Sequence, residues 1–362
     1  MKYQTMDILL GLAAILFFIS IALFVAGLVN PRWVPLFTKG EKTRKRAAVV
    51  YGLSTIIFLT LVGIIPSQTT KSESDTVPSL SEPNIKAALP KCFKELKAST
   101  VRQTTDQPDD NSDYQVHVIY AIPSDGVDRQ LDTNGTVATS VSAWQNWLCN
   151  QTNDKYFRLD TNKRLLDVTF VRLDASDEDI KTGKDLPFDT TSDSQYEYVV
   201  NGIDFRLKKL GFNDPHKLYA VYYDGTTNIK ACGQAVVDGS LHTAAVYLHG
   251  ILSTGKKCDT ADFTTDYTKP GFYDYEMVHQ IIHSLGFVPD CAPHVSKSAH
   301  SVTDSNTDIM YHGNDEPMLT EGLVLDFYRD DYYDSGLGYL DCPDLSVNAF
   351  LVGGVSQLPP KW

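Results

Sequence analysis

The most informative stretch of the chain reads Tyr275-Glu-Met-Val-His279-Gln280-Ile-Ile-His283-Ser-Leu-Gly286. Its large apolar residues recur at positions 277, 278, 281, 282 and 285, which predicts one face of an α-helix. His279 and His283 lie four residues apart on the opposite face, so both imidazoles can bind one metal ion. Gly286 follows where a glycine often ends a helix. The alternative is two surface histidines on an ordinary amphipathic helix.

The helix differs from the zinc-peptidase pattern H-E-x-x-H at the position of the general base. That pattern has a glutamate directly after the first histidine, and this chain has Gln280. An amide can hydrogen-bond to a metal-bound water but cannot accept its proton. Positioned general acid–base catalysis contributes about 10²–10⁴-fold, so we expect a loss of at least that size. Glu276, one turn earlier, is a candidate substitute base; it could instead orient a histidine or lie in solvent.

The sequence beyond the helix strengthens the metal hypothesis. It runs Gly286-Phe-Val-Pro-Asp-Cys-Ala-Pro-His294 and later Asp308-Ile-Met310-Tyr311. Together with the two helical histidines, these phrases resemble the metzincin clan of zinc peptidases, and more narrowly a group of secreted bacterial metzincin-like proteins. The resemblance extends from about residue 114 to the C-terminus and does not include the apolar N-terminal segments.

This resemblance implies an α+β fold. It implies a twisted mixed sheet over two helices, an active-site helix and a mostly irregular C-terminal part. It also implies bound Zn²⁺, with Met310 in a turn below the metal and Tyr311 directly after it. The segment 244–248 is a candidate for the edge strand on which a peptide lies, or is an ordinary sheet strand.

The third metal ligand departs from the clan's pattern. The clan has a histidine three residues after the glycine, and here that position is Pro289, which has no donor atom for zinc. A site with two histidines alone would be weak, because stable zinc sites hold three or four protein ligands. Of the candidates Asp290, His294, His300 and Asp304, we favour His300, because only a short loop separates it from Met310. His294 is the alternative, and a solvated loop histidine is the other interpretation of either residue.

Two N-terminal segments have the length and composition of membrane spans. Residues 8–29 and 47–65 contain no charged side chain, and each segment is long enough to cross about 30 Å of hydrocarbon. The loop between them carries six Lys or Arg residues and one acid, so the positive-inside tendency places it in the cytoplasm. We therefore predict a transmembrane helical hairpin over residues 1–65, a two-pass location in the cell membrane, and an extracytoplasmic remainder.

The six cysteines all follow these segments, as expected in an oxidising compartment. Six cysteines allow fifteen sets of three disulfides. Pairing sequence neighbours gives Cys92–Cys149, Cys232–Cys258 and Cys291–Cys342; free buried thiols are the alternative. Charge is also divided: residues 1–65 carry +5 and the whole chain −13, which leaves −18 for the rest. Such an acidic domain would repel nucleic acid.

The remaining chain divides into a linker and one domain. Residues 66–113 are mostly polar and predict a stalk, with a short helix expected near 85–97. Residues 114–362 are long enough for one core. Strands are predicted at 114–122, 165–173, 218–223 and 244–248, and helices at 137–149 and 196–210. The acidic segment 326–334 could bind Ca²⁺, but a solvated loop with packed tyrosines is favoured.

Three functions are compatible with the sequence. The favoured one is a membrane-anchored, zinc-binding metzincin-like protein with weak or no peptidase activity, which holds a peptide or protein ligand outside the cell. The first alternative is an active zinc metallopeptidase that cleaves peptides. The second is a metal-free surface binding protein. Gln280 separates the first two, and the zinc content separates both from the third.

Overall fold

A computed structural model describes residues 92, 94–187, 198–236, 243–252, 255, 257–258, 263–297, 299–311, 322–338 and 342–353. The chain separates into two compact units, Met1–Asn84 and Ile85–Trp362. The predicted spans 8–29 and 47–65 lie outside the described residues. Within the described ranges, none of the helices is both long enough and apolar enough to cross a membrane.

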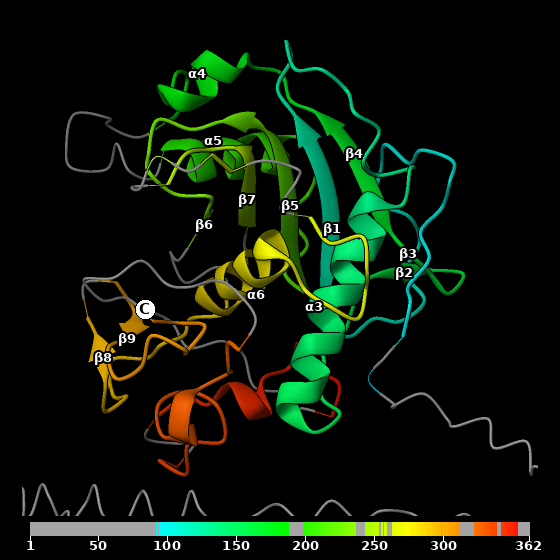
Figure 1. The fold of residues 1–362 in the computed structure, drawn as a ribbon. Helices are drawn as coiled ribbons and strands as arrows, with labels where there is room; N and C mark the ends of the chain where they lie inside the picture. The colour runs from blue at the N-terminus through cyan, green and yellow to red at the C-terminus, as the bar shows by residue number, and fades with distance from the viewer. Residues whose placement is uncertain are drawn as a thin grey trace, which may run out of the picture. The chain divides into compact units, whose positions relative to one another are not determined.

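A five-stranded mixed sheet forms the centre of the second unit (Figure 1). Its strands are β1 (Gln115–Ile122), β4 (Val168–Arg172), β5 (Lys217–Thr226), β6 (Gly233–Ala235) and β7 (Thr243–His249), in the order β4-β1-β5-β7-β6. The β1–β4, β1–β5 and β5–β7 pairs are parallel, and β6 runs antiparallel to β7. The class predicted from the sequence, a mixed α and β fold, is confirmed.

Alternating side chains on the strands give the sheet two buried faces. On β1, Val118 and Tyr120 belong to one core, while Ile119 and Ala121 belong to the other. This is the period of two that a strand imposes. The central strands are therefore apolar on both sides, as parallel strands covered by helices usually are.

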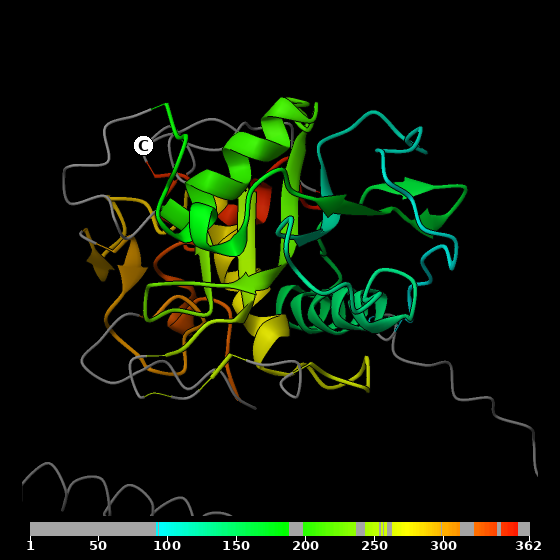
Figure 2. The same cartoon turned by 90° about the horizontal axis from the view of Figure 1, so that it is seen from above.

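Helices cover both faces. Figure 2 shows α3 (Thr136–Thr152) and α6 (Phe272–Ser284) on one side of the sheet, and α5 (Tyr198–Lys209) on the other with the short α4 (Asp177–Lys181). A sheet lying over two helices, as implied by the resemblance, is therefore only part of the architecture. After α6 the described chain is mostly irregular, as predicted. It contains the hairpin of β8 (Val295–Ser296) and β9 (Ser301–Val302), and the short helices η3 (Phe327–Arg329) and η4 (Leu345–Val347).

The predicted strands and helices are found close to their expected positions. The stretch 165–173 forms β3 (Leu165–Leu166), which pairs with β2 (Thr161–Asn162), and then β4. The edge-strand assignment of 244–248 is wrong, because β7 lies between β5 and β6. The edge strand next to β7 is β6, which is only three residues long and starts with a glycine, so no strand pattern was visible there.

Residues 94–113, expected in the linker, pack against the domain. Their backbone forms parallel bridges from Ala98 to Leu166 and from Gln103 to Thr169, along the outer side of β3 and β4. The backbone of Leu96 donates a hydrogen bond to Ser142 on α3. Residues 94–97 are not helical, so the short helix expected near 85–97 is absent from its described part.

Three disulfides connect the pairs predicted from the sequence: Cys92–Cys149, Cys232–Cys258 and Cys291–Cys342. The first attaches the start of the domain to α3, and the last joins the turn after α6 to the C-terminal segment. These crosslinks fit an extracytoplasmic location, because disulfides persist in oxidising compartments.

Asp274 connects α6 to the core and predicts a pH-dependent stability. Its carboxylate, 0% exposed, accepts hydrogen bonds from the Ser140 hydroxyl and from the Gly271 N–H. Burial raises the pKa of Asp274 to about 7 despite these two donors. The folded state then keeps a proton that the unfolded chain loses near pH 4, so this group weakens folding as pH rises from about 4 to about 7.

We expect the Asp274→Asn variant to lose part of this pH dependence. Between pH 5 and 7 the free energy of unfolding of the wild type should fall more steeply, by on the order of 1 kcal/mol per pH unit. Urea unfolding with chelator present and disulfides intact measures both proteins. The exposed Asp334→Asn variant is the control and should follow the wild type. Parallel curves for wild type and Asp274→Asn would contradict the assignment.

Candidate metal centre

The predicted histidine-bearing helix is α6, and its two histidines face each other. The Nε2 atoms of His279 and His283 are 3.0 Å apart, and the ring planes are nearly perpendicular. The helix packs on β6 and β7, and its side chains Met277, Val278, Ile281 and Ile282 are fully buried. Gly286 ends it with φ at 88°, a left-handed conformation that glycine adopts without strain, as predicted.

The other ring nitrogen of each histidine contacts a backbone carbonyl. His279 Nδ1 lies 2.7 Å from the Ile309 oxygen, and His283 Nδ1 lies 3.1 Å from the Phe287 oxygen. A carbonyl oxygen can only accept, so both Nδ1 atoms carry hydrogen. If both rings are neutral, their Nε2 lone pairs then face each other. Two lone pairs at this distance repel unless a proton or a metal ion lies between them.

A metal ion satisfies both lone pairs at once. Zn–N bonds of about 2.0–2.1 Å at a tetrahedral angle place two nitrogens about 3.3 Å apart, close to the observed separation. Histidines that bind metals almost always donate their second N–H to a carbonyl or carboxylate, as both do here. The spacing and orientation of the two imidazoles are therefore compatible with both binding one metal ion.

The predicted Met-turn lies directly beside this pair. Met310 is fully buried in the core, and its neighbour Ile309 supplies the carbonyl bound by His279. The turn is held by Asp308, whose carboxylate accepts hydrogen bonds from the backbone N–H of Met310 and of Phe327 and from the Tyr332 hydroxyl. Tyr311 pairs with Val302 in a parallel bridge. Asp308 had no assigned role in the sequence, although its place before the Met-turn was visible.

Gln280 occupies a buried position against the edge strand. Its side-chain amide donates to Glu276 Oε1 at 2.9 Å, and both residues are less than 10% exposed. A Cβ added at Gly233 on β6 would lie 2.6 Å from Glu276 Oε1 and 3.0 Å from Gln280 Cγ. Only glycine fits there, so the backbone of β6 packs directly against both side chains. Glu276 is therefore bonded to Gln280, rather than to a histidine or to solvent as the sequence had suggested.

The third ligand is not identified by the geometry. Within the described residues, no His, Cys, Asp or Glu joins His279 and His283 in a group whose ligand atoms lie within 4.8 Å of one another. The His300 backbone oxygen accepts from Val288 N at 2.9 Å, which places its backbone next to the turn that binds His283. His300 stays a prediction as the third ligand. His294 lies instead among Asp304, Asp330 and Asp331, and Asp290 is exposed.

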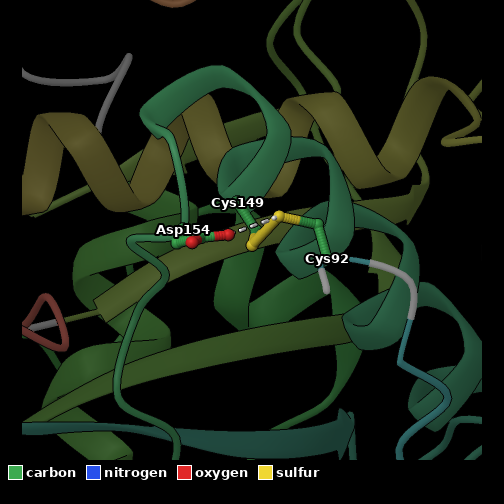
Figure 3. A group of neighbouring side chains, drawn as sticks. All are labelled: Cys92, Cys149 and Asp154. Carbon is green, nitrogen blue, oxygen red and sulfur yellow. Dashed lines mark hydrogen bonds between the residues drawn. A yellow bond between two sulfur atoms is a disulfide. The ribbon is translucent and has the colours of Figure 1, made fainter. Parts of the chain in front are cut away.

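Two other groups of possible ligands have structural explanations. Asp106, His117, Asp160 and Asp167 converge, but the ammonium of Lys217 already bonds Asp106 and Asp160. The second group is Cys92, Cys149 and Asp154, shown in Figure 3. Its two sulfurs are bonded to each other, so they offer no thiolate to a metal; Asp154 Oδ1 lies 3.6 Å from Cys92 Sγ.

The acidic segment 326–334 is a folded loop. Asp326 is buried, and its carboxylate accepts from the backbone N–H groups of residues 330–333. Tyr332 and Tyr333 are packed in the core, as predicted, but Asp326 and Asp331 are buried and not solvated.

No protein-family model matches the chain, and no curated protein matches it.

Proposed function

We propose that this chain is a membrane-anchored, extracytoplasmic metzincin-like protein that binds Zn²⁺ and has little or no peptidase activity. The observation that carries the proposal is the pair of Nε2 atoms 3.0 Å apart, with both Nδ1 atoms directed at backbone carbonyls. His279 and His283 would hold the ion, and His300 is the proposed third ligand. The bound ion would polarise a carbonyl group and lower the pKa of a bound water.

The weak activity follows from Gln280. In a working hydrolase, a carboxylate at this position takes the proton of the metal-bound water. The Gln280 amide donates to Glu276, so its oxygen is the atom left for a water, and an amide oxygen does not hold a proton at neutral pH. The site can therefore polarise a peptide carbonyl without completing its hydrolysis. A ligand would lie along β6, the edge strand beside Gln280, by strand addition.

The proposed membrane anchor is supported by the N-terminal sequence, and the extracytoplasmic location by the three disulfides. Two uncharged segments flank a basic loop at the N-terminus, and three disulfides connect the domain that follows. An oxidising compartment beyond the membrane accommodates both features.

Zinc content is the direct test. The full chain, purified in detergent, should contain about one zinc per chain by elemental analysis. We expect the His279→Ala/His283→Ala variant to contain none, because no described ligand replaces the two imidazoles. His300→Ala should lower zinc affinity by about 10–100-fold or more, since a tetrahedral site loses one of its protein ligands.

A matched control is His216→Ala, which removes a half-exposed histidine that lies 3.5 Å from Asp214 and contacts the Tyr114 ring. Its zinc content should equal that of the wild type. Absence of stoichiometric zinc from the wild type would refute the proposal and favour a metal-free binding protein. Chelator-sensitive cleavage of peptides by the wild type would favour the active metallopeptidase instead.

A further inference from the structure

A second group of ligands lies apart from the histidine pair. His294, Asp304, Asp330 and Asp331 each offer one ligand atom, and these four atoms lie within 4.8 Å of one another. His294 Nδ1 is 3.1 Å from Asp331 Oδ2 and 3.9 Å from Asp330 Oδ2. We call this group the His294 cluster. It brings three carboxylates and one imidazole together.

Several carboxylate oxygens of this cluster have no well-aligned donor. Both oxygens of Asp304 and Oδ1 of Asp330 are shielded from solvent, and within the described part of the chain none of them makes a hydrogen bond of good geometry. Burial raises the pKa of Asp304, although the backbone N–H groups of Asp304 and Ser305 act in the opposite direction. Asp331 is 0% exposed, and the contacts of its carboxylate among the described residues are with the backbone N–H and the imidazole of His294. Asp331 is buried, Asp304 is partly buried, and the Asp330 side chain is 40% exposed. Carboxylate oxygens that are shielded from water are costly unless they are paired, and one imidazole supplies at most one positive charge for the three carboxylates.

The surrounding chain holds these groups in place. His294 and Asp304 stand at the open end of the β8–β9 hairpin, where the Thr303 backbone N–H donates to the His294 oxygen. Asp330 and Asp331 belong to the loop that Asp326 folds through bonds to its backbone N–H groups. The same loop supports the Met-turn through Asp308 and Phe327. The cluster therefore joins two segments of the irregular C-terminal part.

We infer that the His294 cluster is a second cation site, which binds a hard, oxygen-preferring divalent ion such as Ca²⁺ or Mn²⁺. Ligand oxygens at about 2.3–2.6 Å from such an ion lie at most about 5 Å apart, as these atoms do. Carboxylate-rich sites favour Ca²⁺ and Mn²⁺ over softer ions. Of these two ions, Mn²⁺ accepts an imidazole ligand more readily than Ca²⁺ does. The bound ion would occupy the position that the buried carboxylate oxygens face.

This inference is independent of the proposed zinc site, because the two groups share no ligand. The competing explanation is that Asp304 is protonated and the cluster is simply a hydrogen-bonded corner. The two explanations differ in how the protein responds to added ions, and in what the replacement of the carboxylates does to stability.

The test uses the full chain in detergent, stripped by chelator and reloaded with one equivalent of Zn²⁺. Addition of Ca²⁺ or Mn²⁺ should raise the melting temperature by about 5–10 °C at 100-fold above the Kd. Tb³⁺ should bind in place of Ca²⁺ and emit when tyrosine is excited, because Tyr332 adjoins Asp331 in the sequence. The Asp304→Asn/Asp330→Asn variant should lose both signals, whereas His279→Ala/His283→Ala should keep them.

The Asp334→Asn variant is the matched control, because it removes one exposed carboxylate from the same loop and should respond like the wild type. The inference is overturned if neither Ca²⁺ nor Mn²⁺ shifts the wild type, or if only Zn²⁺ does. It is also overturned if Asp304→Asn/Asp330→Asn melts at a higher temperature than the wild type both with and without added ions. That result would mean that the carboxylates of the cluster repel one another and that no cation binds between them.

Discussion

A Lys217→Met variant is expected to be less stable than the wild type by about 3–5 kcal/mol, the usual cost of removing one partner from a buried ion pair. The Lys217 side chain is 3% exposed, and its ammonium lies 2.7–2.8 Å from carboxylate oxygens of Asp106, Asp109 and Asp160. Burial alone would lower the pKa of Lys217, but hydrogen bonds to these three aspartates outweigh it and raise the pKa. The lysine is therefore charged at neutral pH.

The reason for the large effect is the charge left behind. The Asp160 side chain is 0% exposed, and without Lys217 its remaining partner is His117, whose Nδ1 lies 2.6 Å away. Asp106 and Asp109 belong to the segment 94–113, so the same substitution should detach that segment from β5. Limited proteolysis within 99–113 is expected to accelerate in the variant.

Urea unfolding with intact disulfides measures the effect. The control is Lys184→Met, which removes a half-exposed ammonium 2.9 Å from Asp179 and should cost less than about 1 kcal/mol. If Lys217→Met costs no more than the control, the aspartates around Lys217 do not depend on its charge, and this account of the network is wrong.

The second prediction with a large effect concerns the pair of Glu276 and Gln280. Exchanging the two residues, in a Glu276→Gln/Gln280→Glu variant, should raise peptidase activity at least about 100-fold above the wild type, within the 10²–10⁴ range of positioned general bases. The exchange keeps one amide donor and one carboxylate acceptor in the space next to Gly233. It moves the carboxylate to the position next to His279.

The single Gln280→Glu variant is expected to behave differently. It places two carboxylates in contact where the amide and carboxylate are now 2.9 Å apart, and Gly233 leaves no space for them to separate. Two such groups cannot both ionise, so one keeps a proton and its pKa rises. The activity of this variant should therefore increase only at higher pH than that of the exchanged variant.

The measurement is kcat/KM against pH for an unstructured peptide mixture, with zinc-loaded protein. Glu276→Gln alone is the control, because it removes a carboxylate without creating a base, and it should show no gain. Wild-type activity equal to that of the exchanged variant would show that Gln280 does not limit hydrolysis. If Gln280→Glu and the exchanged variant both bind zinc and are both inactive, a feature of the site other than Gln280 prevents hydrolysis.

Much of the fold could be predicted because its signals are local. Runs of β-branched and aromatic residues located β1, β5 and β7, and helical periodicity located α6 together with the glycine at its end. The three disulfides followed from pairing neighbours among cysteines that all lie after the apolar segments. The strand β6 was missed because three residues beginning with glycine carry no periodicity.

The two candidate ion sites were predictable to different degrees. His279 and His283 are four residues apart, and helix geometry alone places them together. His294 was considered as a zinc ligand, yet it lies with Asp304, Asp330 and Asp331. That arrangement depends on a hairpin and a separate loop folding against each other. Sequence spacing gives no distance between such segments, so it could not show that His294 lies with these aspartates.

The amino-acid sequence by itself determined the periodic elements, the paired imidazoles on one helical face, and the amide in place of a base, because each depends on neighbours within about two helical turns. Tertiary structure was needed for everything that joins distant segments: the Ile309 carbonyl that orients His279, the glycine of β6 that clamps Glu276 to Gln280, and the lysine that balances three aspartates. Those contacts arise from packing of the sheet, helix and loops, and packing is not encoded in the spacing of residues along the chain.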